Sequence, residues 1–147
     1  MSAPETATGG LFMHVTFDMC SRPCCLPVVR AAVGQLAAMV GWDETECRAI
    51  TLAVDEALAN VIRHAYNNRP DGLIELECRE SAEGLEIVLL DNGNTPDRAK
   101  ICAREVGCDQ AGGLGTHIIK DVMDTVSYEV SPEGNRFVAT KKLRRTP

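Results

Sequence analysis

The chain has 147 residues, which is close to the usual size of one domain and enough for a single hydrophobic core. Hydrophobic residues make up 45% of it and charged residues 24%, as in ordinary soluble globular proteins. The net charge of -6 gives no general basic field that would attract a nucleic-acid backbone, so we expect no direct nucleic-acid partner. We expect a flexible leader over residues 1–9 and a single domain over residues 10–147.

The sequence predicts neither a membrane span nor a secretory signal. No apolar run approaches the roughly 20 residues that cross a bilayer. The N-terminal segment MSAPETATGG has no basic leader followed by an apolar stretch. We therefore expect a cytoplasmic protein.

Seven cysteines are present, an odd number, and most are isolated in regular segments, which argues against a disulfide framework. Cys20, Cys24 and Cys25 lie close together in the sequence and His14 precedes them, so a metal site is one alternative. The spacing lacks the second pair of ligands that structural zinc sites have, and buried free thiols are common. Simple packing is the favoured interpretation.

The first half of the chain predicts one strand and two helices. Apolar and polar residues alternate over residues 10–19, as in a half-buried strand. After a proline-containing break, small apolar residues predict a helix over residues 28–40 that ends at a glycine. Asp43 is the expected N-cap of a second helix, with Glu46 in the capping-box position. This central helix is expected to continue to about Asn67.

The second half predicts two hairpins separated by a loop and a helix. The expected elements are strands over 73–80 and 85–90, a loop over 94–112 with a short helix at 97–104, a helix over 113–124, and strands over 125–130 and 136–143 around a turn at 131–135. Hairpin strands with helices between them predict an α+β fold. We expect a two-layer sandwich in which a mixed, mostly antiparallel sheet has helices on one face.

A polar stripe follows the central helix beside its apolar face. Glu56, Asn60, Arg63 and Asn67 are spaced so that, at roughly 100° per residue, they lie near one line on the helix surface. Glu56 can accept a proton, and the Asn60 amide oxygen can bind a hard cation such as Mg2+. A solvated helix surface is the alternative, since most charged helical residues face water.

Two further elements have the residue types of a nucleotide site. Asp91 follows a predicted strand, and Gly93 lets the backbone turn closely, so the carboxylate could accept a hydrogen bond from the exocyclic amine of adenine. The same Asp-Asn-Gly sequence is also an ordinary turn signal. Gly112, Gly113 and Gly115 precede a helix, where backbone amides favour an anion, although such glycines can also be a flexible helix entry.

These elements, in this order, resemble the Bergerat-fold ATPases, the superfamily of histidine kinases, type II topoisomerases and mismatch-repair ATPases. The segment EALANVIRHAY is similar to the helix motif of its small bacterial branch, the serine/threonine kinases that act as anti-sigma factors in partner-switching systems. GGLGTHIIKDVMDTVSYE resembles the second glycine box and the strand beyond it. The resemblance extends from about Leu11 to Leu143.

The resemblance implies site residues and cofactors. The resemblance implies that Glu56 is the general base, that Asn60 is the Mg2+ ligand, and that Asp91 is the carboxylate that binds the adenine of ATP. The nucleotide site implied by the resemblance consists of Asn60, His64, Asp91, Gly93, Gly113, Leu114, Gly115 and Thr116.

The function implied is transfer of a phosphoryl group from ATP to a serine or threonine hydroxyl of an anti-sigma factor antagonist, a STAS-type protein. Sequestration of a sigma factor by a homodimer is implied as the second function. The sequence departs from the family pattern at Thr95, where the first glycine box often has a second glycine, and at Thr116 and His117, which replace apolar residues.

Two alternatives differ in class from this kinase. One is a regulatory module that binds partners, with or without nucleotide, and transfers no phosphate, which the altered first glycine box favours. The other is the detached catalytic domain of a sensor kinase that acts on histidine. It is the weaker of the two, because no dimerisation helices or phosphoacceptor segment precede the domain.

Overall fold

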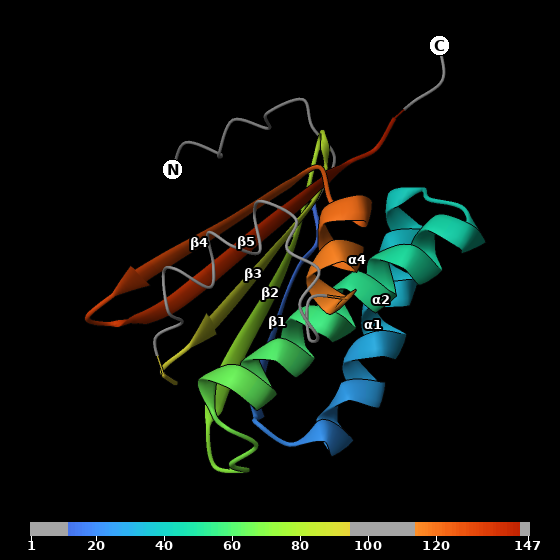
Figure 1. Cartoon of the computed structure of the whole chain (residues 1–147). Coiled ribbons are helices and arrows are strands. Elements are labelled where there is room, and N and C mark those ends of the chain that lie inside the picture. Colours follow the sequence, from blue (N-terminus) through green and yellow to red (C-terminus); the bar gives the residue numbers. More distant parts are fainter. Residues whose placement is uncertain (1–11, 95–113, 145–147) are drawn as a thin grey trace, which may run out of the picture.

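The computed structural model describes residues 12–94 and 114–144 and shows a five-stranded sheet with helices on one face (Figure 1). The strands are β1 (His14–Cys20), β2 (Leu73–Ser81), β3 (Gly84–Asp91), β4 (Thr125–Ser131) and β5 (Gly134–Lys142). The helices are α1 (Leu26–Val40), α2 (Glu44–Asn60) and α4 (Leu114–Val122), with a 3-10 turn η1 (Pro23–Cys25) before α1 and a π-helical turn η2 (Val61–Ala65) after α2. The described strand pairs are all antiparallel, in the order β1-β2-β3-β5-β4. The predicted α+β two-layer sandwich is confirmed.

The hydrophobic core lies between the sheet and the helical layer. β3 is the central strand, flanked by β2 and β5, and its residues Leu85, Ile87 and Leu89 are buried. They share one core with Ile50 and Leu58 of α2. Because α2 packs against both α1 and α4, the helix that the sequence placed at the centre of the fold lies in the middle of the helical layer.

The N-terminal elements agree with the predicted ones apart from their ends. β1 covers residues 14–20, so it begins later than the predicted strand over 10–19 and ends one residue after it. The burial of its side chains alternates along the strand, as expected. α1 begins at Leu26, before the predicted start, because Pro27 can occupy the first turn of a helix. It ends before Gly41, whose φ of 127° is accessible to glycine.

α1 and the turn before it are also unusually apolar. By length and composition Pro23–Val40 could span a membrane. The side chains of Val29, Val33 and Leu36 are buried in the same core as α2. Packing therefore explains part of the apolar composition of this helix, while Val28 and Met39 are exposed.

Asp43 is the N-cap of α2, as predicted. Its carboxylate accepts a hydrogen bond from the Glu46 backbone N–H at 2.8 Å, which satisfies one of the free amides of the first turn. The Glu46 carboxylate contacts Nζ of Lys141 on β5 at 3.2 Å. The second half of the predicted capping box is thus replaced by an ion pair between the helical layer and the sheet.

The central helix ends two residues before the predicted end at about Asn67, and its last turn is not α-helical. The α-helical part ends at Asn60, and η2 widens the last turn, with the Tyr66 N–H donating to the carbonyl of Val61, five residues earlier. Asn67 has a left-handed backbone conformation, with a φ of 50°. The π-helical turn breaks the 100° spacing on which the predicted stripe depended, so Asn67 lies outside the helix.

The C-terminal hairpin has a shorter turn than the sequence predicted. β4 extends to Ser131 and β5 begins at Gly134, so Asn135 is a strand residue that pairs with Asp91 of β3. α4 begins at Leu114 and has Ile119 in the core, close to the expected helix over 113–124. The expected loop over 94–112 and short helix at 97–104 lie almost wholly outside the described residues.

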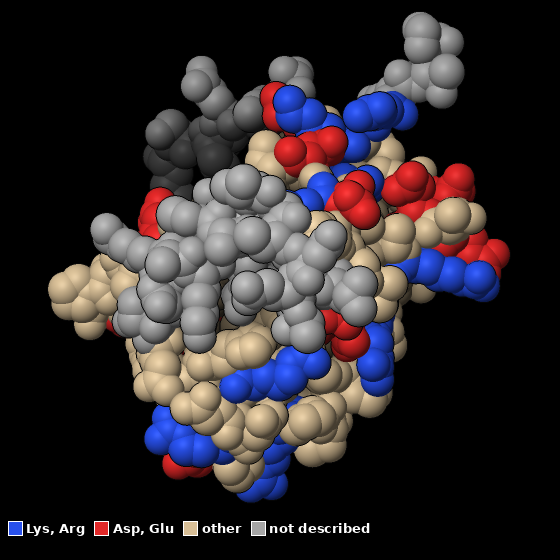
Figure 2. Space-filling model, in the orientation of Figure 1, with Lys and Arg blue, Asp and Glu red and all other residues tan. Residues whose placement is uncertain are grey.

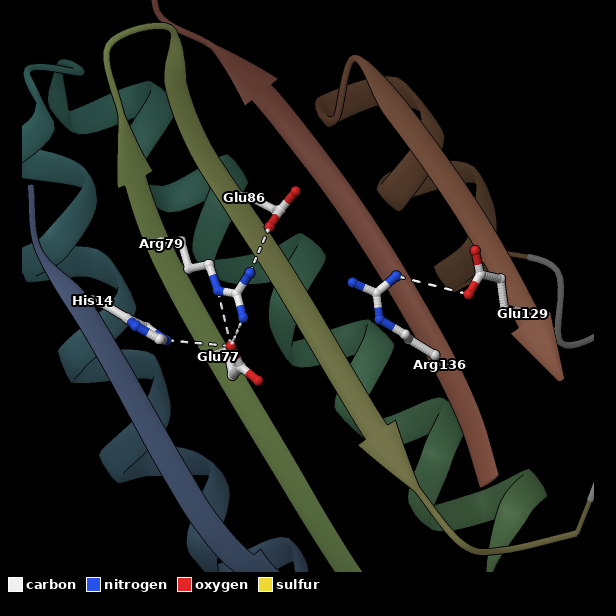
Figure 3. Close-up of polar contacts among 6 residues, drawn as sticks. All are labelled: His14, Glu77, Arg79, Glu86, Glu129 and Arg136. Atoms are coloured by element: carbon white, nitrogen blue, oxygen red, sulfur yellow. Dashed lines mark hydrogen bonds and ion pairs between the residues drawn. The ribbon is translucent and has the colours of Figure 1, made fainter. Parts of the chain in front are cut away.

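Ion pairs cross the strands on the face of the sheet opposite the helices (Figure 3). Glu77 of β2 contacts His14 of β1 at 3.2 Å and also pairs with Arg79, which lies 3.6 Å from Glu86 of β3. Burial raises the pKa of Glu77, but its contacts with Arg79 and His14 outweigh that and lower it overall. A further ion pair joins β5 to β4 at 3.9 Å. Figure 2, drawn from the viewpoint of Figure 1, shows acidic and basic side chains interspersed on the described part of the surface that faces the viewer.

Candidate nucleotide site

One wall of the candidate site is the polar side of α2. Nη2 of Arg63 donates a hydrogen bond to Oδ1 of Asn60 at 3.1 Å and lies 3.7 Å from Oε2 of Glu56. The Glu56 side chain is 26% exposed. The structure thus brings together three residues of the predicted stripe, while Asn67 does not join them because the helix ends first. Ala53, Val54 and Ala57 on the buried side fix this helix against the core.

The end of β3 forms the second part of the candidate site. Asp91 is only 5% exposed, and its Oδ1 accepts hydrogen bonds from the Gly93 N–H at 2.9 Å and from Nδ2 of Asn135 at 2.8 Å. Burial raises the pKa of Asp91, and these two hydrogen bonds partly offset that rise. No described residue donates to Oδ2. The turn and the site interpretations are therefore compatible, because the turn uses only Oδ1.

Asn135 is a site-supporting residue that the sequence analysis missed. It is 3% exposed, and Nδ2 also lies 3.4 Å from the Gly93 carbonyl oxygen and 3.3 Å from that of Asn94. Its place in a Gly-Asn pair after a proline made it look like part of a turn. Only the pairing of β3 with β5 places it opposite Asp91.

The end of the helix and the end of β3 are joined by backbone contacts. The Asn94 N–H donates to the carbonyl of Ala65, the last residue of η2, at 2.7 Å. The Asn92 N–H donates to the Tyr66 hydroxyl at 2.9 Å, and that hydroxyl donates to the carbonyl of Leu73. The segment that follows α2 and the turn that follows Asp91 are therefore held together.

Gly93 is required at this junction for steric reasons. A Cβ atom at this position would lie 2.5 Å from the carbonyl oxygen of Ala65. Such an approach is closer than any real Cβ contact, so a side chain would force the two segments apart. The structure thus gives a reason for glycine here that does not depend on a ligand.

The predicted phosphate end of the site is only partly described. Gly113 lies outside the described residues. Leu114, Gly115 and Thr116 form the first turn of α4, as expected for residues at a helix N-terminus, and α4 packs against α2. His64 belongs to η2, one residue after Arg63.

The metal alternative at the cysteines gains no support. Among the residues that the structure describes, no three His, Cys, Asp or Glu side chains are grouped so that they could hold a metal ion. His14 contacts Glu77. The amide oxygen of Asn60 is a suitable ligand for Mg2+, which prefers oxygen, although Arg63 donates to that oxygen in the present arrangement.

Comparison with known proteins identifies the family. Residues 20–141 match the model of the histidine kinase-like ATPase domain. The serine-protein kinase RsbW of Listeria innocua is 30% identical over 141 residues, covering 89% of each chain. RsbW of Bacillus velezensis is 25% identical over 139 residues, covering 88% of this chain and 86% of its own.

Solved structures agree on the fold. The RsbU and RsbW domains of a Mycobacterium tuberculosis protein match with a TM-score of 0.59 at 15% identity, over 93% of this chain and 34% of that one. The histidine kinase domain of a blue-light activated histidine kinase from Erythrobacter litoralis matches with a TM-score of 0.53 at 18% identity, over 79% of this chain and 58% of that one. The resemblance seen in the sequence is confirmed, and the chain belongs to the histidine kinase-like ATPase domain family.

Proposed function

We propose that this protein is an ATP-dependent serine/threonine-protein kinase. The observation that carries the proposal is a helix bearing Glu56 and Asn60 whose end is joined by hydrogen bonds to the turn after Asp91, a buried carboxylate whose Oδ2 accepts no hydrogen bond from a described residue. The similarity to relatives named serine-protein kinase supports the choice of a protein hydroxyl as acceptor.

Asp91 would recognise the adenine of ATP. Its Oδ2 can accept a hydrogen bond from the exocyclic amine, while Asn135 and Gly93 keep Oδ1 in place. Because the hydrogen-bonded carboxylate is fixed before the base arrives, little side-chain entropy is lost on binding. Gly93 would allow the base to lie close to the backbone.

The polar side of α2 would serve the phosphates. Asn60 would hold Mg2+, which when bound neutralises the phosphate charge, and Arg63 would release the Asn60 oxygen for that purpose. Gly113, Leu114, Gly115 and Thr116 would offer backbone amides to the phosphates at the start of α4. His64 is proposed to line the same site.

Glu56 would act as the general base. It would accept the proton of the serine or threonine hydroxyl as that oxygen attacks the γ-phosphorus and ADP departs. Arg63 lies 3.7 Å from Glu56 and keeps the carboxylate near Asn60. The base would therefore be close to the metal ligand that orients the phosphates.

The partners belong to the same proposal. The substrate would be a STAS-type anti-sigma factor antagonist, and the kinase would be cytoplasmic, act as a homodimer and sequester a sigma factor. The acidic chain gives no reason to expect direct binding of nucleic acid.

Phosphate transfer to a purified antagonist tests the proposal. With radiolabelled ATP we expect a stable phosphoserine or phosphothreonine on the antagonist, and loss of transfer in Glu56→Gln with nucleotide binding retained. Glu44→Gln is the matched control, because Glu44 is an exposed carboxylate on the same helix that pairs with Arg48. Equal transfer by both variants would contradict the role of Glu56, and an acid-labile phosphohistidine would favour the histidine-directed alternative.

A partner-binding module without phosphate transfer is the second candidate. Thr95 in the first glycine box favours it, as does the existing hydrogen bond from Arg63 to the oxygen that would bind the metal. In that case the antagonist or sigma factor would bind, whether or not ATP changes the affinity, and no phosphate would be transferred.

A further inference from the structure

Three cysteines belong to the junction between β1 and α1. Cys20 is the last residue of β1, and Cys24 and Cys25 are the last two residues of η1. The Sγ atoms of Cys20 and Cys25 are 3.8 Å apart, within thiol hydrogen-bond distance, and both residues are partly exposed. Nothing in the proposed kinase mechanism uses these thiols.

The backbone holds the two thiols close to each other. The Arg22 N–H donates to the Cys20 carbonyl at 2.8 Å, and the Cys25 N–H donates to the Arg22 carbonyl at 3.0 Å, so the chain reverses between them. Buried Ser21 anchors this reversal, since its N–H donates to the Gly72 carbonyl at 2.8 Å and its Oγ accepts from the Gly72 N–H at 2.9 Å. The proximity of the thiols is therefore a property of the folded junction.

We propose that Cys20 and Cys25 form a reversible intramolecular disulfide when the protein meets a peroxide. The sulfurs need to approach by about 1.8 Å to reach the ~2.05 Å of a disulfide bond. Cys24 is a poorer partner for Cys25, because adjacent Cα atoms are only ~3.8 Å apart, below the roughly 4.4–6.8 Å that disulfides span. The proposal does not depend on the kinase function.

The chemistry balances with hydrogen peroxide as the oxidant. One thiolate attacks a peroxide oxygen, the O–O bond breaks, and a sulfenic acid and water form. The second thiol attacks the sulfenic sulfur, the S–O bond breaks, and a second water leaves as the S–S bond forms. Two thiols are oxidised and one peroxide is reduced, and an added dithiol reverses the change by becoming a disulfide itself.

Cys25 is a protonated thiol before it meets an oxidant. Burial raises the pKa of Cys25, and the neighbouring Cys20 and Cys24 raise it further, so its thiol is protonated at neutral pH. Oxidation should therefore accelerate as the pH rises toward the thiol pKa. This dependence gives the proposal a kinetic signature in addition to the product.

Peptide mapping of the full chain tests the proposal directly. Trypsin does not cleave before proline, so its first product is residues 1–30, which contain Cys20, Cys24 and Cys25 and no other cysteine. After peroxide treatment and blocking of free thiols, we expect this peptide to have lost two hydrogens and to have a single blocked thiol, at Cys24. Dithiothreitol should restore three blockable thiols.

The variants and the unfolded chain serve as controls. The Cys20–Cys25 disulfide should still form in Cys24→Ser and should be lost in Cys20→Ser and Cys25→Ser. In urea, where the fold no longer holds the two thiols together, we expect a mixture of disulfide pairings. The proposal would be overturned if the peptide still had three blocked thiols after peroxide, or if it had gained oxygen without losing hydrogen. A disulfide that includes Cys24, or one that links two chains, would also overturn it.

Discussion

Replacement of Asn135 by alanine is the most informative test of how the candidate site is built. Asn135 donates to the buried Asp91 carboxylate at 2.8 Å, and its two longer contacts, to the carbonyl oxygens of Gly93 and Asn94, are at 3.4 and 3.3 Å. A hydrogen bond to a charged group contributes about 1.5–3 kcal/mol, and the longer contacts add little. We therefore expect Asn135→Ala to lower the free energy of unfolding by about 2–3 kcal/mol at neutral pH.

The loss should depend on pH with a definite sign. Burial raises the pKa of Asp91, so the folded state binds its proton up to a higher pH than the unfolded chain does. This group therefore favours folding at low pH, and that contribution is lost as the pH rises through the folded-state pKa. Without the Asn135 donor the pKa of Asp91 rises further, so the deficit of the variant is full at neutral pH and shrinks as acid protonates Asp91.

Urea unfolding of both proteins at neutral and mildly acidic pH measures this difference. Asn92→Ala is the matched control, because Asn92 is an exposed asparagine in the same turn whose backbone N–H, rather than its side chain, bonds to Tyr66. A change below about 0.5 kcal/mol, as typical surface substitutions give, would refute the reasoning. A deficit that stays the same at both pH values would refute the assignment of a charged Asp91 as the partner.

Three further substitutions test the junction around the site and the helical layer. Gly93→Ala should cost about 1–3 kcal/mol, since its Cβ would lie 2.5 Å from the carbonyl oxygen of Ala65; thermal unfolding unchanged from the parent would contradict this. Tyr66→Phe should cost about 1–3 kcal/mol in urea unfolding, because two backbone groups lose their hydroxyl partner; the prediction fails if stability is retained. Arg30→Ala should cost less than about 1 kcal/mol, because the Arg30 side chain in its 3.3 Å ion pair with Asp55 is 46% exposed; a loss above about 2 kcal/mol would contradict the surface assignment.

The sequence was sufficient to predict the layers of the fold. The apolar face of the central helix was predicted correctly, because Ile50, Val54 and Ala57 of α2 and Val61 of η2 all lie in the core. The strand pattern of β1 and the glycine that ends α1 are equally local signals. Such features depend on a residue and its near neighbours, so they can be predicted from the sequence without tertiary contacts.

The end of the central helix could not be predicted in the same way. A stripe drawn at 100° per residue assumes that the helix stays α-helical, whereas η2 widens it after Asn60. The Ala65 carbonyl accepts its bond from Asn94, which lies far along the chain. This long-range contact has no local sequence signal, and the helix was predicted too long as a result.

Asn135 was missed for a related reason. Its neighbours Pro132 and Gly134 are typical of a turn, so the local sequence predicts a turn residue at this position. The register of β5 on β3 places it opposite Asp91, and its burial follows from that pairing. A residue of this kind could have been found by asking which polar residue pairs with the candidate carboxylate across the sheet.

Calorimetric titration with ATP, with and without Mg2+, tests the central claim most directly. The parent protein should bind ATP saturably, Asp91→Asn should weaken that binding with or without Mg2+, and Asn60→Ala should lose the contribution of Mg2+ while retaining the nucleotide. Absence of binding at millimolar ATP, or identical titrations for the parent and both variants, would contradict the claim that Asn60 and Asp91 form a nucleotide site.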